Sequence, residues 1–131
     1  MIRHLALLLF ILTLPARSLA ESDCAQARST IEQYYAALTT GDQAGLQNTT
    51  RGPLLKQHNS QFRNPNYADH LRTFYANFAY DILSCKGSAS SSLLISVTEF
   101  YGQQDRINKF FTVDISQGYR IVHISLIESP L

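Results

Sequence analysis

Residues 80–128 have the sequence YDILSCKGSASSSLLISVTEFYGQQDRINKFFTVDISQGYRIVHISLIE, in which apolar and polar residues alternate along most of the length. A period of two is typical of half-buried β-strands, and polar breaks that contain glycine are typical of turns. We therefore predict four consecutive antiparallel strands. Their ranges are Tyr80 to Cys85, Ser91 to Tyr101, Ile107 to Ser116 and Arg120 to Glu128.

The expected register keeps the apolar side chains on one face of the sheet, because a slip of one residue would turn every side chain over. Across the turn at residues 102–106, the pairs that satisfy this condition are Val97 with Phe111 and Glu99 with Lys109. The charged pair therefore falls at one end of the apolar face.

A two-residue turn is predicted at residues 117–118, because Gly118 can adopt a positive φ at no steric cost. The pairs that follow are Val113 with Val122 and Phe111 with Ile124. For the first strand two alternatives stay open, Tyr80 with Ile82 or Leu83 with Cys85 on the apolar face.

The first 20 residues have the basic start, the apolar run and the small residues that characterise a signal peptide. A membrane anchor would need about 18 to 20 apolar residues, and Pro15 and Arg17 interrupt the run too early. We therefore expect residues 1–20 to be removed and residues 21–131 to form one exported domain, periplasmic or secreted.

The charge balance is close to neutral, with 11 Lys and Arg against 10 Asp and Glu. Removal of residues 1–20 takes away Arg3 and Arg17, which leaves 9 basic residues and a net charge of −1. Such a chain has no basic footprint for nucleic acid, and no membrane segment remains after cleavage.

The chain has two cysteines, Cys24 and Cys85, and in an exported protein of this size they are expected to form a disulfide. The four histidines show no His-x-x-x-His spacing, and the cysteines are not arranged as Cys-x-x-Cys. We therefore predict no metal site and no cofactor.

Three helices are predicted ahead of the strands. The first spans Asp23 to Thr40, with Asp23 and Gln26 as a capping box and Gly41 as its stop. Asp42 caps a short second helix that runs to about Asn48 and carries Ala44 and Leu46 inward. The third spans Asn66 to Phe78. Between them, residues 49–65 are expected to be irregular, with at most a short strand or helical turn near Leu54 and Leu55.

This order predicts an α+β domain in which helices cover one face of a curved antiparallel sheet. Residues 31–42, IEQYYAALTTGD, resemble the first helix and turn of the NTF2-like superfamily. Residues 71–77, LRTFYAN, are similar to the pocket-covering third helix of its ketosteroid isomerase and SnoaL-like branch. The resemblance implies an NTF2-like (cystatin-like) cone that ends in a four-strand meander.

The same resemblance indicates that the isomerase catalytic set is incomplete. Ketosteroid isomerases use an Asp base and an oxyanion hole made of a Tyr and a protonated Asp. Tyr34 matches that tyrosine, but residues 51–62, where the base belongs, contain no Asp or Glu, and Phe111 stands near the place of the acid.

Two residues remain as weak catalytic candidates, Tyr34 and Glu99. A tyrosine on the apolar stripe of a helix is more often a core residue with its hydroxyl at the rim. Burial of a carboxylate on the apolar face of the sheet could fit it for acid or base work. Opposite Lys109, however, a cross-strand ion pair at the end of the sheet is the simpler interpretation of Glu99.

We therefore expect a non-catalytic binding domain that holds either a small apolar ligand in its cone or a protein partner on its sheet. The residues expected to line the ligand site are Tyr34, Tyr75, Val97, Glu99 and Phe111. The alternatives are a SnoaL-like or isomerase-like enzyme that uses Tyr34 and Glu99, and a subunit of a secretion or envelope assembly.

The second face of the sheet is more apolar than a freely solvated surface should be. The residues that parity places there are Phe100, Phe110, Ile121 and Ile127. This face is expected to form a homodimer interface or to bind a protein partner.

Overall fold

The computed structural model of the protein describes residues 17–89 and 91–127. Most of the predicted signal peptide, residues 1–16, lies outside the described residues, as does Glu128 at the expected end of the last strand. In the described part, no helix is both long and apolar enough to cross a membrane.

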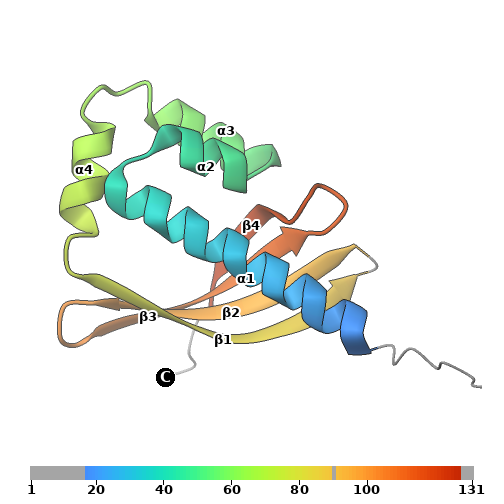
Figure 1. Cartoon of the computed structure of the whole chain (residues 1–131). Helices are drawn as coiled ribbons and strands as arrows, with labels where there is room; N and C mark the ends of the chain where they lie inside the picture. The colour runs from blue at the N-terminus through green and yellow to red at the C-terminus, as the bar shows by residue number, and fades with distance from the viewer. Residues whose placement is uncertain (1–16, 90, 128–131) are drawn as a thin grey trace, which may run out of the picture.

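Four helices precede the sheet in the part of the chain that the structure describes. They are α1 (Arg17–Thr40), α2 (Gln43–Thr49), α3 (Gly52–Gln61) and α4 (Tyr67–Phe74). Figure 1 shows that all four lie on the same side of the sheet, with α1 running across it and α4 beside the end of α1.

An open antiparallel sheet follows, formed by β1 (Phe78–Ala89), β2 (Ser92–Tyr101), β3 (Asp105–Asp114) and β4 (Arg120–Leu126). The strands are ordered β1-β2-β3-β4, each hydrogen-bonded to the next. The predicted α+β class and the four-strand meander are therefore confirmed.

The predicted register between β2 and β3 is wrong by two residues. Val97 lies opposite Lys109 rather than Phe111, and Glu99 lies opposite Ile107. The cause is a tighter turn, because Tyr101 already pairs with Asp105 and Gly102 takes a φ of 64°. A shift of two keeps every side chain on its face, so the apolar face itself is as predicted.

The turn between β3 and β4 is longer than two residues, since Asp114 pairs with Arg120. Gly118 does adopt a positive φ, of 74°. A bulge then restores the expected pairing of Phe111 with Ile124 but sets Val113 opposite Ile121 instead of Val122. Ile121, predicted on the second face, is consequently buried in the core.

A second bulge resolves the question left open for β1. Tyr80 and Ile82 pair with β2 on the core face, the register shifts at Leu83, and Cys85 returns to the same face. Leu83 itself is 60% exposed. Both predicted alternatives were incomplete, because strict alternation cannot place three of these four residues on one side.

The segment predicted to be irregular contains the ten-residue helix α3. A Gly-Pro pair such as Gly52-Pro53 is typical of a loop, but Pro53 lies in the first turn of α3. At that position its fixed φ suits a helix and its missing N–H costs nothing. Arg51 N–H donates to the Ile121 carbonyl at 3.0 Å, which joins the start of α3 to the edge of β4.

Three other predicted helix features differ from the structure. Asp23 is not a cap, because α1 begins at Arg17. Ala44 is exposed, whereas Leu46 is buried as expected. The third predicted helix is too long, since α4 ends at Phe74 and Phe78 already belongs to β1.

Gly41 determines how α4 reaches the end of α1. It adopts a φ of 67°, and a Cβ there would lie 2.6 Å from the Ala68 carbonyl oxygen. A glycine is therefore required both by the backbone conformation and by the close approach of α4. This contact holds α4 above the end of the sheet where β2 and β3 turn.

The core lies between α1 and the sheet. Its fully buried large side chains are Ile31, Tyr35, Leu46, Ile95, Val97, Phe111, Val113 and Ile121. The rings of Tyr35 and Tyr80 stack with centroids 4.2 Å apart. The interior beneath α1 is therefore filled by aromatic and branched side chains.

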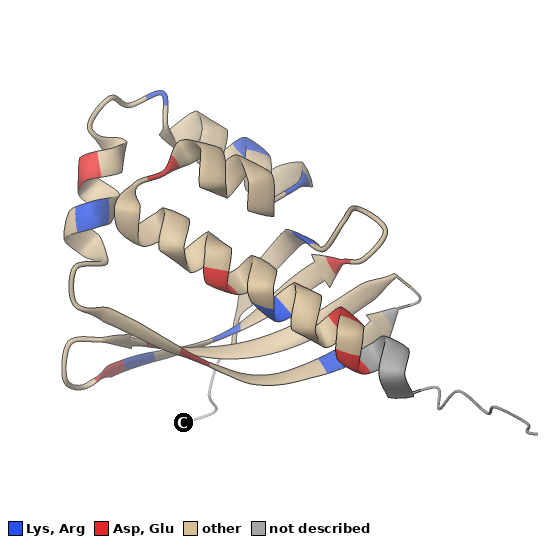
Figure 2. Cartoon of the chain, viewed as in Figure 1, with Lys and Arg blue, Asp and Glu red and all other residues tan. Residues whose placement is uncertain are grey.

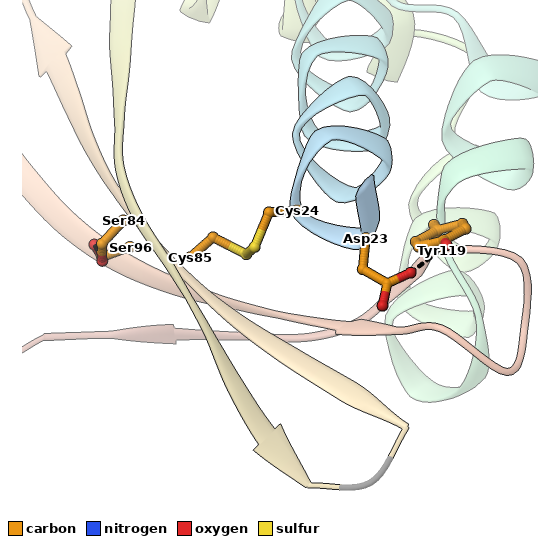
Figure 3. Close-up of a disulfide and its surroundings, with 6 residues drawn as sticks. All are labelled: Asp23, Cys24, Ser84, Cys85, Ser96 and Tyr119. Atoms are coloured by element: carbon orange, nitrogen blue, oxygen red, sulfur yellow. Dashed lines mark hydrogen bonds between the residues drawn. A yellow bond between two sulfur atoms is a disulfide. The ribbon is translucent and has the colours of Figure 1, made fainter. Parts of the chain in front are cut away.

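The predicted disulfide is confirmed, and it joins α1 to β1 with Cys24 and Cys85 Cα atoms 6.0 Å apart. Figure 3 shows the two side chains meeting between the helix and the strand, near the Asp23–Tyr119 hydrogen bond. Tyr119 donates to Asp23 Oδ1 at 2.6 Å. These two contacts attach the start of α1 to both β1 and the β3–β4 turn.

We expect the double substitution Cys24→Ala and Cys85→Ala to lower the free energy of unfolding by about 2 to 4 kcal/mol, because the crosslink closes a long loop. Urea unfolding of a protein that comprises residues 21–131 measures this loss. Thiol labelling of the unreduced, unfolded wild type should find no free cysteine. Two labelled thiols, or equal stabilities of the two proteins, would contradict the crosslink.

Candidate functional site

A hollow lies where α4 approaches the β2–β3 turn, and we call it the large cleft. It has a volume of about 830 Å³. Its lining combines aromatic and aliphatic side chains with a few polar ones, chiefly Phe74, Tyr75, Tyr101, Ile107, Lys109 and Leu126. Phe74, Ile107 and Leu126 are three of the four large hydrophobic residues that are exposed in the described chain.

A second hollow, the small cleft, adjoins the first beneath α3 and α4. It has a volume of about 380 Å³. Tyr75, Lys109 and Leu126 line both clefts, so the two hollows meet at these side chains. The small cleft is the more polar in character, because Tyr34, His58 and two glutamines also line it.

A buried carboxylate lies next to the large cleft. Glu99 is 1% exposed, and its Oε2 accepts a hydrogen bond from Tyr35 at 2.6 Å. Its Oε1 accepts from Tyr101 at 2.6 Å and contacts Lys109 Nζ at 2.7 Å. The predicted ion pair of Glu99 and Lys109 is therefore confirmed, although it runs diagonally across the strands rather than directly.

The hydroxyls around Glu99 stay protonated at neutral pH. Burial, followed by the charge of Glu99, raises the pKa of Tyr35 well above its usual range. The pKa of Tyr101 is raised by burial and by its hydrogen bond to Glu99, and that of Tyr75 is raised to about 12, mainly by burial. Tyr35 and Tyr101 therefore act as fixed donors to the carboxylate.

We expect Lys109→Ala to destabilise the protein by about 3 kcal/mol, because it leaves a buried carboxylate without its cation. Adding Glu99→Gln should restore part of the loss, since the charge that needed compensation is then gone. Urea unfolding of the single and double variants gives the coupling. Lys86→Ala, at an exposed lysine on β1, is the control and should change stability by less than about 0.5 kcal/mol. A Lys109→Ala variant as stable as this control would contradict the assignment.

Tyr34 and His58 form a second buried polar pair. The Tyr34 hydroxyl lies 2.9 Å from His58 Nε2, and both side chains are buried. Burial raises the pKa of Tyr34 and lowers the pKa of His58, although the neighbouring Gln61 opposes the second shift. The pair is therefore neutral at pH 7, a phenol beside an uncharged imidazole.

A glutamine approaches the buried ring of His58. Nδ1 of this ring is buried, and a hydrogen bond from Gln61 opposes the lowering of the His58 pKa. Gln61 Oε1 also accepts from Tyr67 at 2.8 Å, and an amide oxygen has two lone pairs with which to serve both groups.

The five residues predicted to line a ligand site are placed in two groups. Tyr75 lines both clefts and Tyr34 lines the small one. Val97 and Phe111 are fully buried in the core, and Glu99 lies behind Tyr101 and Lys109. These three line neither cleft.

Sequence reasoning missed three polar residues of the site. Tyr101 lies two residues after Glu99, so alternation along the strand predicts that both side chains lie on the same face of the sheet. Tyr35 follows Tyr34 directly in α1 and was not singled out by the pattern, although both side chains are buried. Nothing in the sequence indicated that His58 is buried beside a cleft, because its segment was expected to be irregular.

No cluster of three or more metal-ligating side chains occurs among the described residues. Figure 2 shows that charged residues of both signs are spread over the helices and the sheet. Comparison of the chain with protein-family models, curated proteins and solved structures finds no significant match.

Proposed function

We propose that this protein is an exported binding domain that takes a small, largely apolar molecule into its large cleft. The observation that carries the proposal is the grouping of exposed apolar side chains. Three of the four exposed large hydrophobics in the described chain line this one cleft. Contiguous exposed apolar surface of this kind marks binding sites, and the volume lies within the range of small-molecule pockets.

The charges at the cleft favour a ligand without a formal charge. Lys109 is the cation common to both clefts, and the ion pair with Glu99 compensates it. Arg106 and Asp105 contribute one further charge of each sign to the lining. A charged ligand would lose its hydration without meeting an uncompensated partner.

We propose that the fold is an NTF2-like cone. Support comes from the helices on one face of an antiparallel meander, and from Tyr34 and Tyr75 beside the same hollow. The helix α3 departs from the expectation of an irregular segment with at most a short strand or helical turn near Leu54 and Leu55. A measured structure in which the strands do not curve around α1 would contradict the proposal.

The contacts of Glu99 argue against the isomerase-like alternative. A general base must come within about 3 Å of the proton that it removes. Both oxygens of Glu99 already accept from protein donors, and the carboxylate lines neither cleft. We therefore propose binding rather than catalysis.

We expect Leu126→Ser to weaken binding of the neutral fluorophore N-phenyl-1-naphthylamine by about 5- to 10-fold, because it removes apolar contact worth about 1 kcal/mol. Leu83→Ser is a matched control. Leu83 and Leu126 are 60% and 65% exposed, but Leu83 does not line the cleft. Fluorescence titration of the wild type and both variants measures the affinities.

The control should bind like the wild type. Equal losses in the two leucine variants would indicate non-specific adsorption to apolar surface. Absence of saturable binding to the wild type would overturn the proposed function.

We further propose that the uncovered face of the sheet mediates self-association. The described helices leave this face open, as Figure 1 shows. Phe100, Phe110 and Ile127 on it are half-buried within the monomer, and Arg106 lies 5.4 Å from the Phe100 ring centroid. Ile121 no longer belongs to this set.

Sedimentation of the mature protein at micromolar concentration should detect a dimer that Phe110→Lys dissociates, because a lysine on each copy would bring like charges together. Ala44→Lys, at an exposed position of α2 on the helical side of the sheet, is the control and should leave the dimer intact. A wild-type protein that sediments as a monomer would contradict self-association.

A further inference from the structure

We propose that the outer edge of β1, over residues 78–82, binds an extended peptide segment of a partner protein as an added strand with alternating apolar and cationic side chains. This inference is independent of the ligand proposed for the large cleft. The starting observation is a groove between α1 and β1, with a volume of about 380 Å³, that shares no lining residue with the large or the small cleft.

The two outer edges of the sheet differ in how they are covered. β1 and β4 are the outermost strands of the order β1-β2-β3-β4. At β4, Arg51 N–H donates to the Ile121 carbonyl and Thr50 forms a parallel bridge with Ile121, so the start of α3 occupies part of that edge. In the described chain, the backbone of residues 78–82 forms hydrogen bonds only to β2. Every second residue of this run therefore directs its N–H and C=O outward without a partner.

This part of β1 is a regular strand of limited length. Its pairing with β2 runs without interruption from Phe78 opposite Tyr101 to Ile82 opposite Val97. A bulge between Ile82 and Ser84 then ends the regular run. Bulges on edge strands restrict pairing with other chains. The edge therefore offers five residues, enough for one short added strand.

The groove beside this edge has an aromatic base. The Phe78 and Tyr80 rings lie on the helix side of the sheet, with centroids 5.2 and 4.2 Å from that of Tyr35. Ala36 and Thr39 form the wall on α1, which Figure 1 shows lying over the sheet close to β1. A strand added to β1 directs alternate side chains to this side of the sheet. Apolar side chains at those positions therefore fit the groove.

Two carboxylates flank the edge. Glu32 lines the groove and Asp81 lies on the opposite face of β1, and both side chains are exposed. Burial, followed by the charge of Glu32, raises the pKa of Tyr80, so this carboxylate lies near the strand. In the part of the chain that the structure describes, neither carboxylate forms an ion pair, not even with Arg28 one turn earlier on α1. Opposite charges on adjacent strands stabilise their pairing, so the edge favours a cationic partner.

The same carboxylates disfavour a second copy of this chain as the occupant. Antiparallel pairing of residues 78–82 with their equivalents would bring the two Asp81 carboxylates close together on one face of the joined sheet. Like charges in such positions are destabilising. A small molecule does not supply N–H and C=O groups at the spacing of a β-ladder. A basic extended peptide is therefore the occupant that satisfies both the backbone and the charges.

The test uses the fluorescein-labelled peptide acetyl-Lys-Val-Lys-Val-Lys-Val-Lys-amide and a protein that comprises residues 21–131. Fluorescence anisotropy should show saturable binding with a Kd of about 100 μM or tighter. Two further peptides carry backbone N-methyl groups, one on its valines and the other on its two central lysines. Because an added strand bonds through one of its edges, only one methylated peptide should lose affinity, by about 10-fold or more. Absence of saturable binding, or equal effects of the two methylations, would overturn the inference.

Protein variants test the groove and its charge. Ala36→Phe fills the groove and should weaken binding of the unmethylated peptide by about 10-fold or more. Ala44→Phe, at an exposed alanine of α2 outside the groove, is the matched control. Glu32→Gln should weaken binding by about 2- to 5-fold, whereas Glu21→Gln, at an exposed glutamate of α1 that does not line the groove, should not. Equal affinities of each variant and its control would contradict this site.

Sedimentation distinguishes a peptide partner from a second copy at the same edge. We expect the peptide to leave the association state of the protein unchanged, because self-association is proposed through the face of the sheet and not through β1. Dissociation of a wild-type dimer by the peptide would identify the edge as the contact between copies. That outcome would overturn the assignment of the edge to a partner protein.

Discussion

The end of this domain that contains the large cleft is held together by the buried carboxylate of Glu99 and its three donors. Tyr35 comes from the C-terminal part of α1, Tyr101 from the end of β2 and Lys109 from β3, and all three converge on Glu99. A charge with 1% exposure would be strongly unfavourable without such compensation. The need to compensate it therefore ties the helix to two strands and positions Tyr101 and Lys109 at the large cleft.

The opposite end of α1 is held by different chemistry. The Cys24–Cys85 crosslink and the hydrogen bond from Tyr119 to Asp23 attach it to β1 and to the β3–β4 turn. With both ends of α1 fixed, aromatic and branched side chains fill the core beneath it. The two clefts lie at the end of the sheet that α3 and α4 cover, which is where we place the ligand.

The sequence was sufficient to predict the strands, the disulfide and the contact of Glu99 with Lys109. Alternation of apolar and polar residues shows which face of a strand is buried. A register error of two residues, as between β2 and β3, leaves each side chain on the same face, so the predicted face stays correct. The two bulges could not be predicted from the sequence, because the extra residue of a bulge interrupts the alternation of apolar and polar residues from which the strand faces were inferred. Their consequence was the wrong placement of Ile121 and the unresolved face of Leu83.

What the sequence by itself determined is therefore local or periodic: the α+β order of elements, the apolar face of the sheet, the stop at Gly41 and the pairing of the only two cysteines. Tertiary structure decided the site. His58 meets Tyr34 from 24 residues away and Tyr35 meets Glu99 from 64, and no periodicity relates such positions. Their contacts follow from how α3 and α1 pack on a bulged sheet, and that packing depends on side-chain volumes and backbone irregularities that a pattern of apolar residues does not contain.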